Sequence, residues 1–106
     1  MIYNPEADIL ARIERCQGFD WDAGNLDKNL ITHGVTVEEC EQVFQSARVF
    51  VKSDAAHSQQ EERFCMFGST SEGRLLSVFF TLRDNRIRVI SARDMSAMER
   101  QAFGTP

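Results

Sequence analysis

The chain is poor in several residue types that mark particular classes of protein. Its 106 residues include three cysteines, two prolines and two histidines. The cysteines, at positions 16, 40 and 65, are odd in number and widely spaced, and no Cys-x-x-Cys pair occurs. This pattern argues against a disulfide framework and against a zinc site. We therefore expect three free thiols in apolar surroundings.

Long apolar runs are also absent. No segment approaches the ~20 consecutive apolar residues that a membrane-spanning helix requires. The first twelve residues lack the basic start and apolar centre of a signal peptide. We therefore expect a cytoplasmic protein that does not engage a membrane. The length predicts a single domain over residues 1–106, large enough to form a hydrophobic core without disulfides or a structural metal.

Lysine is scarce, and the basic residues are unevenly spread. Residues 1–61 carry five basic and eleven acidic groups, whereas residues 62–106 carry seven arginines, five acids and no lysine. Arginine is the better bidentate partner for phosphate and carboxylate groups. We therefore expect an anionic ligand to bind the C-terminal part of the chain. The net charge of −4 argues against a general nucleic-acid binder.

Residues 86–93 form the most informative stretch, because they read as a strand with arginine on both faces. No glycine or proline interrupts the segment, and branched apolar residues recur along it. A period of two predicts one face made of Ile87, Val89, Ser91 and Arg93, and another made of Arg86, Arg88, Ile90 and Ala92. Such a strand fits the inside of a small sheet that presents guanidinium groups to an anion. The alternative is that these arginines pair with local carboxylates at the rim of the sheet.

Capping signals predict the helices. The predicted helices span residues 4–17, residues 23–33, a segment that follows Thr36, and residues 97–103. Thr36 with Glu39, and Ser96 with Glu99, have the spacing of capping boxes. The short link at residues 34–36 predicts that the second and third helices form an antiparallel pair. Residues 19–22 are a short extended piece that anchors Phe19 and Trp21, more typical of core residues than of a base-stacking platform.

A change to period two predicts the sheet. The predicted strands span residues 48–52, 62–68, 74–83 and 86–93. Asp84 and Asn85 form a two-residue hairpin turn, because both residue types tolerate the positive φ angles of a type I′ turn. The expected fold class is α+β, with N-terminal helices, then a four-stranded antiparallel sheet, then a short C-terminal helix.

Motifs in a fixed order along the chain carry a family resemblance. They are Trp21-Asp22, Asn29, His33-Gly34-Val35, Asp54, His57, Glu61, Arg63, Gly73-Arg74, Thr81, the run from Arg88 to Arg93, and Glu99. With these motifs, from about Phe19 to Phe103, the sequence resembles the BrnT family, the toxin halves of bacterial type II toxin–antitoxin pairs. The helix predicted within residues 1–18 is an addition to shorter members.

The resemblance implies a compact fold akin to RelE-type ribonuclease toxins. It implies RNA cleavage without a metal or other cofactor, and a resulting inhibition of translation. It also implies a BrnA-type antitoxin with a ribbon-helix-helix DNA-binding part, repression of the operon by the complex, and toxin homodimers within that complex. The sequence departs from the family pattern at Asn25 and Thr32, where basic residues are common.

Metal-free RNA cleavage requires a base, an acid and cations that hold the phosphate. With the resemblance, His57 and Glu61 are the candidate proton-transfer groups, and their order of action stays open. The candidate phosphate ligands are Arg63, Arg88 and Arg93. In a regular strand Arg88 and Arg93 have opposite parity, so both line one site only if Arg93 lies beyond the regular strand.

Each candidate also has a structural reading. His57 can be a loop residue hydrogen-bonded to Asp54, and His33 can favour the negative end of a helix dipole. The three arginines can form internal ion pairs with Glu61, Asp94 or Glu99. The missing basic residues at Asn25 and Thr32 and the pI of about 5.1 also leave a second hypothesis, in which the chain is a non-catalytic interaction module or co-repressor subunit whose arginine face binds an acidic partner.

Overall fold

The computed structural model describes residues 4–26, 33–57 and 60–104, with the backbone alone at residue 57. The elements are α1 (Pro5–Glu14), α3 (Val37–Gln45), β1 (Phe50–Ser53), the 3-10 helix η1 (Ala55–His57), β2 (Arg63–Ser69), β3 (Leu75–Arg83), β4 (Arg86–Asp94) and α4 (Ala97–Phe103). The helix predicted over residues 23–33, and its pairing with α3, fall largely outside the described residues.

The helices begin where the sequence places their caps. The side chain of Asn4 accepts a hydrogen bond from the backbone N–H of Ala7, and Pro5 occupies the first turn of α1. Both predicted capping boxes are present, at the start of α3 and at the start of α4. The bounds of α4 are as predicted, whereas α1 ends three residues before the predicted end at residue 17.

The four strands form an antiparallel meander in the order β1-β2-β3-β4, which confirms the α+β class. The hairpin between β3 and β4 turns at Asp84 and Asn85, whose φ angles are 53° and 60°. Both values lie in the left-handed region that a type I′ turn requires, so the predicted turn is confirmed. The first strand begins at Phe50 rather than at residue 48.

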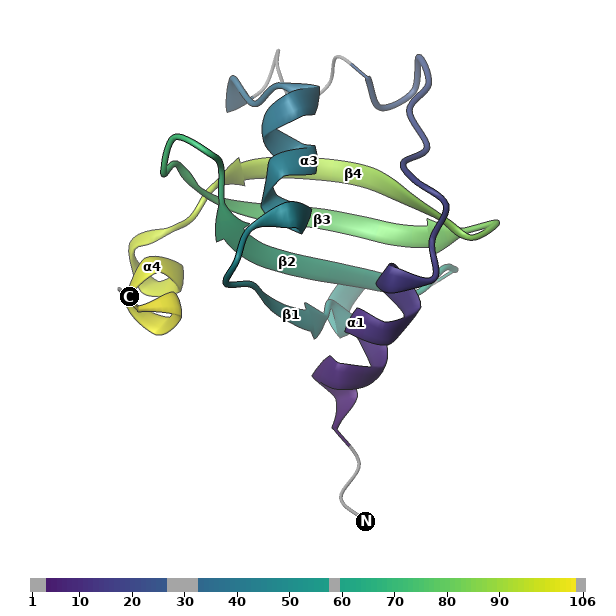
Figure 1. The fold of residues 1–106 in the computed structure, drawn as a ribbon, viewed down its shortest axis with the longest axis horizontal. Coiled ribbons are helices and arrows are strands. Elements are labelled where there is room, and N and C mark those ends of the chain that lie inside the picture. The colour runs from purple at the N-terminus through teal and green to yellow at the C-terminus, as the bar shows by residue number, and fades with distance from the viewer. Residues whose placement is uncertain (1–3, 27–32, 58–59, 105–106) are drawn as a thin grey trace.

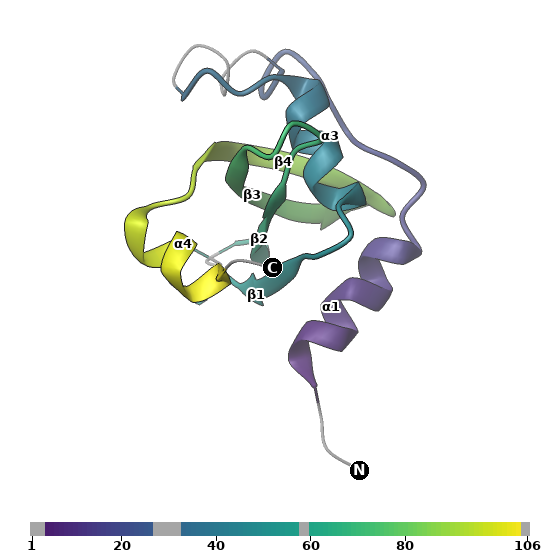
Figure 2. The same ribbon diagram turned by 60° about the vertical axis from the view of Figure 1, so that its left-hand side comes forward.

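The two faces of the sheet differ in what covers them. Helices α1 and α3 lie over one face, and α4 lies on the opposite side (Figures 1 and 2). The main core fills the face under α1 and α3, with Phe64, Val78 and Phe80 fully buried there. Directly paired residues of antiparallel strands point to the same side. The opposite face, here called the open face, therefore carries Phe50, Lys52, Arg63, Cys65, Phe67, Ser77, Phe79, Thr81, Arg88, Ser91 and Arg93.

A β-bulge in β4 overturns the two-face pattern predicted for residues 86–93. Phe79 pairs with Ser91, but the next residue, Phe80, pairs with Val89, so Ile90 is the extra residue. The alternation restarts after the bulge. Residues on the C-terminal side of Ile90 therefore point to the face opposite to the one that strict alternation predicts.

The bulge also removes the parity problem between Arg88 and Arg93. Arg88 pairs with Thr81 and Arg93 pairs with Ser77, so both arginines point to the open face. Strict alternation had placed them on opposite faces, and that prediction is wrong because it counted no inserted residue. The residues of β4 that are buried under α1 and α3 are Ile87, Val89 and Ala92.

The extended piece at residues 19–22 anchors against β4. Phe19 forms a parallel bridge with Ile87, and the backbone N–H of Asp20 donates to the carbonyl of Ile87 at 2.8 Å. The ring of Phe19 stacks on Trp21 and meets Phe44 edge-on. The indole Nε1–H of Trp21 donates to a carboxylate oxygen of Glu41 at 2.8 Å. Both aromatics pack against the core, as predicted.

Arg74 ties the start of α3 to the end of β4. Its guanidinium is 3.1 Å from a carboxylate oxygen of Glu39 and 2.8 Å from one of Asp94. It also donates to the backbone carbonyls of His33 and Gly34. The half-buried Arg74 side chain donates six hydrogen bonds, which give it a structural role.

All three cysteines are free thiols, as predicted. Cys40 and Cys65 are buried, and burial raises the pKa of each thiol to about 12. Half-buried Cys16 has its pKa raised in the same way, partly offset by Arg12 and Arg15. No helix in the described part of the chain is long and apolar enough to span a bilayer.

Candidate functional site

Three of the five predicted site residues line one cavity on the open face. Glu61, Arg63 and Arg88 meet there in a space of about 210 Å³. Arg63 of β2 and Arg88 of β4 both pair with Thr81 of β3, so the three residues form one row across the sheet. The complete lining is Gly24, Asn25, Glu61, Arg63, Thr81, Arg83, Arg88, Val89 and Ile90.

In the cavity, Glu61 is paired with Arg83, which the sequence did not indicate as a site residue. Arg83 donates from Nε and Nη2 to the two carboxylate oxygens of Glu61, at 3.0 and 2.8 Å. These hydrogen bonds lower the pKa of Glu61, and the charge of Arg63 contributes in the same direction. Glu61 is therefore ionised at neutral pH and accepts a proton only weakly. Arg83 lies two residues beyond Thr81 on β3, so the strand period places it on the same face.

Arg88 is held by two aspartates from the extended piece. Its guanidinium donates to both carboxylate oxygens of Asp22, at 3.0 and 3.1 Å, and lies 3.4 Å from Asp20. The hydrogen bonds from Arg88 lower the pKa of Asp22. Only 17% of the Arg88 side chain is exposed. A carboxylate in this bidentate position occupies the geometry that a phosphate group would take on an arginine fork.

Asn25, where the resemblance led us to expect a basic residue, has a structural role in this chain. It is only 4% exposed. Its side-chain oxygen accepts from the N–H of Asp22 at 2.8 Å, and its amide donates to the carbonyls of Asp20 and Val89. Asn25 thereby fixes the aspartate-bearing turn against β4. The Asp-x-x-Asn spacing of residues 22–25 could have indicated this turn from the sequence, because an asparagine side chain often closes a local turn.

Arg93 shares the open face with Arg88 but not the cavity. It pairs with Ser77, four residues along β3 from Thr81, which corresponds to about 13 Å of strand. Its guanidinium donates to both oxygens of Glu99, at 2.6 and 2.9 Å, and lies over the ring of Phe79. The alternative reading, an ion pair with Glu99, thus describes Arg93 in this structure.

Glu99 gathers several donors around one carboxylate. Besides Arg93, the hydroxyl of Ser77 and the backbone N–H of Ser96 donate to it. The Arg93 hydrogen bonds are the main reason that the pKa of Glu99 falls to about 2. Glu99 therefore fastens the first turn of α4 to the sheet, in addition to closing its capping box.

The remaining predicted residue, His57, is placed only through its backbone. It ends η1, the 3-10 helix that packs beside β2. The backbone N–H of Asp54 donates to the carbonyl of Arg63 at 2.8 Å, so η1 begins beside the cavity residue Arg63. The side chain of His57 lies outside the described residues, and its role stays a prediction.

The described residues do not gather three or more of the side chains His, Cys, Asp and Glu into a group able to hold a metal ion. The charged groups that line the cavity are three arginines and one glutamate. Guanidinium groups can bind a phosphodiester, and a carboxylate beside them can accept a proton. Fold and cavity together define an α+β protein with an arginine–carboxylate site on the open face of an antiparallel sheet.

A family model described as the ribonuclease toxin BrnT of type II toxin–antitoxin systems matches residues 21–99. The chain belongs to this family, which confirms the resemblance seen in its motifs. A search of the curated proteins found no match. The matched segment contains all five predicted site residues and leaves α1 outside. Membership in a type II family implies an antitoxin partner.

Proposed function

We propose that this chain cleaves RNA without a metal ion at the cavity of Glu61, Arg63 and Arg88, and thereby inhibits translation. One observation carries the proposal. Two arginines and a carboxylate from separate segments meet in a single open cavity, on a chain that belongs to a ribonuclease toxin family. A phosphodiester bound there has cations on its oxygens and a proton acceptor beside it.

The proposed reaction is an internal transesterification. The ribose 2′-oxygen attacks the phosphorus as its proton passes to a base, and the bond between phosphorus and the 5′-oxygen breaks as an acid protonates that oxygen. The products are a 2′,3′-cyclic phosphate and a 5′-hydroxyl. Glu61 and His57 share the two proton transfers, and Arg63 and Arg88 stabilise the charge on the phosphate oxygens.

The Asp22–Arg88 pair gives the site a closed resting arrangement. Phosphate must replace the Asp22 carboxylate on the Arg88 fork before it can bind bidentately. Arg93, held by Glu99 about 13 Å along the sheet, contacts another part of the RNA strand. The RNA therefore crosses the open face rather than binding at one point.

The proposal extends to partners and location. The toxin acts in the cytoplasm with a RelE-type fold, and a BrnA-type antitoxin with a ribbon-helix-helix part neutralises it. Within that complex the toxin forms a homodimer, and the complex represses its operon. Family membership supports the antitoxin partner, and the finer features are the parts of the proposal that remain to be measured.

The test is expression of the chain alone in bacteria, followed by growth and by total RNA integrity. We expect growth arrest and RNA fragments, and cleavage in vitro that persists in EDTA. Arg88→Ala should lower the cleavage rate by about 10²–10³-fold, as the loss of a charge-stabilising donor does in other enzymes. Arg86→Ala, an exposed arginine outside the cavity, is the matched control. Normal growth with intact RNA at high soluble expression contradicts the proposal.

A second candidate function has a specific observation in its favour. Arg88 and Arg93 are each bound to a carboxylate of the same chain, so neither guanidinium is open to a phosphate group in this structure. This favours a non-catalytic co-repressor subunit whose arginine face contacts the carboxylates of an acidic partner. The double variant Arg63→Ala and Arg88→Ala separates the two functions. Loss of toxicity with retained antitoxin binding supports the ribonuclease. Loss of partner binding alone supports the second candidate.

A further inference from the structure

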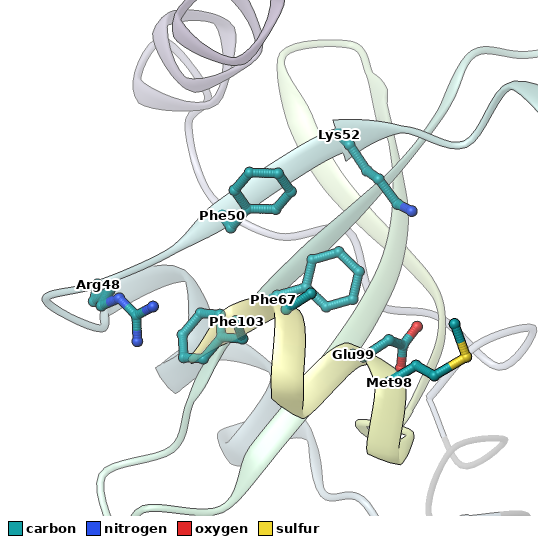
Figure 3. A pocket seen from close by; sticks show the side chains of 8 residues that line it. Arg48, Phe50, Lys52, Phe67, Met98, Glu99 and Phe103 are labelled. Carbon is teal, nitrogen blue, oxygen red and sulfur yellow. The ribbon is translucent and has the colours of Figure 1, made fainter. Parts of the chain in front are cut away.

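The open face carries a second cavity, between β1, β2 and α4. This cavity, here called the α4 groove, has a volume of about 340 Å³, and its apolar walls are Phe50, Phe67, Met98 and Phe103. Figure 3 shows the three aromatic rings, from β1, β2 and α4, gathered on one side, with Met98 reaching out from α4. The groove does not include any of the five predicted site residues.

Two side chains of the groove are unusually exposed for their type. Met98 is 82% exposed and Phe50 is 50% exposed, and among the described residues the only other exposed large hydrophobic is Leu26. Methionine is common on surfaces that accept partner side chains, because it is flexible and polarisable. Apolar side chains gathered around a concavity, rather than scattered singly, indicate an interaction site.

Basic groups stand at the rim of the α4 groove. The Arg48 guanidinium lies 4.1 Å from the ring centre of Phe103, and the Lys52 ammonium lies 5.6 Å from that of Phe67. Within the described part of the chain, neither is paired with a carboxylate. The carboxylate that lines the groove, Glu99, is already bound to Arg93. The groove therefore offers two cations whose charge complements an acidic occupant.

The edge of the sheet shows how a partner can bind. β1 is an outer strand, and such strands often recruit a partner strand through free N–H groups. Here the N–H of Val51 donates to Glu6 of α1 at 3.0 Å, and α1 packs along β1. Strand addition is thus obstructed at this edge. The groove is suited to a partner that docks through its side chains.

We propose that the α4 groove is the docking surface for the antitoxin partner. The occupant is an antitoxin segment that inserts apolar side chains against Phe50, Met98 and Phe103 and places carboxylates near Arg48 and Lys52. This inference rests on the proposed function, because it takes the antitoxin as the partner. Buried apolar anchors in a central pocket, with charges at the rim, are the usual arrangement of a binding hot spot.

The position of the groove explains how docking neutralises the toxin. Phe67, in the groove, pairs with Ser77, and Ser77 lies four residues along β3 from Thr81 in the candidate site. The corresponding distance is about 13 Å, which roughly four further residues of extended chain can span. A segment anchored in the α4 groove can therefore continue across the open face and cover the cavity of Arg63 and Arg88.

The test is calorimetric titration of the full-length chain with a purified BrnA-type antitoxin. Met98→Asp should raise the Kd at least about tenfold, because it places a charge among the apolar anchors. Gln101→Asp makes a matched change at an exposed position of the same helix, outside the groove. Its Kd for the antitoxin should stay within about twofold of that of the unaltered chain. Lys52→Glu should also weaken antitoxin binding, whereas Arg15→Glu, at the exposed C-cap of α1, should not.

Two other results of the titration overturn the inference, and so does a change in the toxin dimer alone. Equal Kd values for Met98→Asp and Gln101→Asp, or no antitoxin binding by the unaltered chain, reject the groove as the docking surface. Loss of toxin dimers in light scattering for Met98→Asp, with unchanged antitoxin affinity, assigns the groove to a second copy of this chain. RNA cleavage is measured separately. Absent cleavage with groove-dependent antitoxin binding rejects the proposed function and leaves this inference standing.

Discussion

Asp22 and Arg88 form the contact that controls access to the candidate site. The Arg88 guanidinium donates two hydrogen bonds to the Asp22 carboxylate, and Asp22 comes from a turn that Asn25 fixes in place. An exposed carboxylate on an arginine fork competes with any phosphate for the same donors. In this structure a group of the protein itself occupies the Arg88 fork. Under the proposed function, RNA would have to displace the Asp22 carboxylate before it binds there.

Removing this competition should strengthen RNA binding. We expect Asp22→Asn to raise the affinity for an uncleavable 2′-O-methyl RNA oligomer by about twofold to fivefold, the range typical of an exposed ion pair. Fluorescence anisotropy measures the change. Asp8→Asn, the same substitution on the exposed side of α1, should leave the affinity unchanged. Weaker binding by Asp22→Asn instead assigns Asp22 the role of orienting Arg88 for the phosphate.

At the scale of the elements, the β3–β4 hairpin sets which side chains face outward. Its two-residue turn fixes the register at Arg83 and Arg86, and the bulge at Ile90 then shifts the register once. Between these two features lies the row of Arg63, Thr81 and Arg88. The turn and the bulge together therefore position the candidate site.

The turn provides a stability prediction. Asn85 has a φ of 60°, which glycine adopts without the steric cost of a Cβ. We expect Asn85→Gly to raise the free energy of unfolding by about 0.5–1 kcal/mol and the melting temperature by about 2–8 °C, because Asp-Gly is a preferred type I′ pair. Ser71→Gly, at a turn position without a positive φ, should lower the free energy of unfolding and the melting temperature slightly. A melting temperature that falls in both variants contradicts the assigned turn.

The attachment of α4 provides a pH-dependent prediction. The folded-state pKa of Glu99 is about 2, below its ordinary value of 4.5, so its stabilising effect is complete above pH 4.5 and is lost as the pH falls toward 2. We expect Glu99→Gln to lower the free energy of unfolding by about 2 kcal/mol at pH 7. The difference from the unaltered chain should shrink steadily below pH 4.5.

Urea unfolding at pH 7, 4 and 2.5 measures this difference. Glu72→Gln, an exposed glutamate in the β2–β3 turn, is the control and should have little effect at any of these pH values. A destabilisation by Glu99→Gln that is independent of pH assigns the effect to packing of α4 rather than to the charge of Glu99.

Over the whole molecule, the charge is divided between an acidic N-terminal part and an arginine-bearing C-terminal part. The sheet brings arginines of β2, β3 and β4 to the open face, while the acidic turn at Asp20 and Asp22 approaches from the side. The net charge of −4 disfavours binding along an extended phosphate backbone. Specific contacts, rather than a broad basic surface, must carry the affinity for RNA.

This charge distribution predicts a weak dependence of RNA binding on salt. If two or three arginines contact phosphates, a plot of the logarithm of the RNA association constant against the logarithm of the salt concentration should have a slope of about −1.4 to −2.1. Each phosphate contact to a single strand contributes about −0.7 to this slope. Filter binding of the 2′-O-methyl oligomer between 50 and 300 mM KCl, about the range over which such slopes are measured, gives the value. A slope near that of a broad basic surface, about −5 or steeper, contradicts the few-contact site.

Local chemistry in the sequence determined most of the fold. The capping boxes, the Asp84–Asn85 turn and the period-two segments each act over a few residues, and the structure has them at or near the predicted positions. The family motifs likewise indicated the class that the family match confirms. A cap or a turn depends on neighbours in the chain, so a single sequence contains the information needed to place it.

The tertiary structure alone decided which charged groups meet. The insertion of Ile90 into the register, the pairing of Arg88 with Asp22 across 66 positions, and the separation of Arg93 from the cavity were not visible in the pattern. From the sequence alone, several carboxylates were possible partners for each arginine of the sheet. Because an ion pair forms wherever packing brings opposite charges together, its partner is fixed by the arrangement of whole elements and not by the residues next to it.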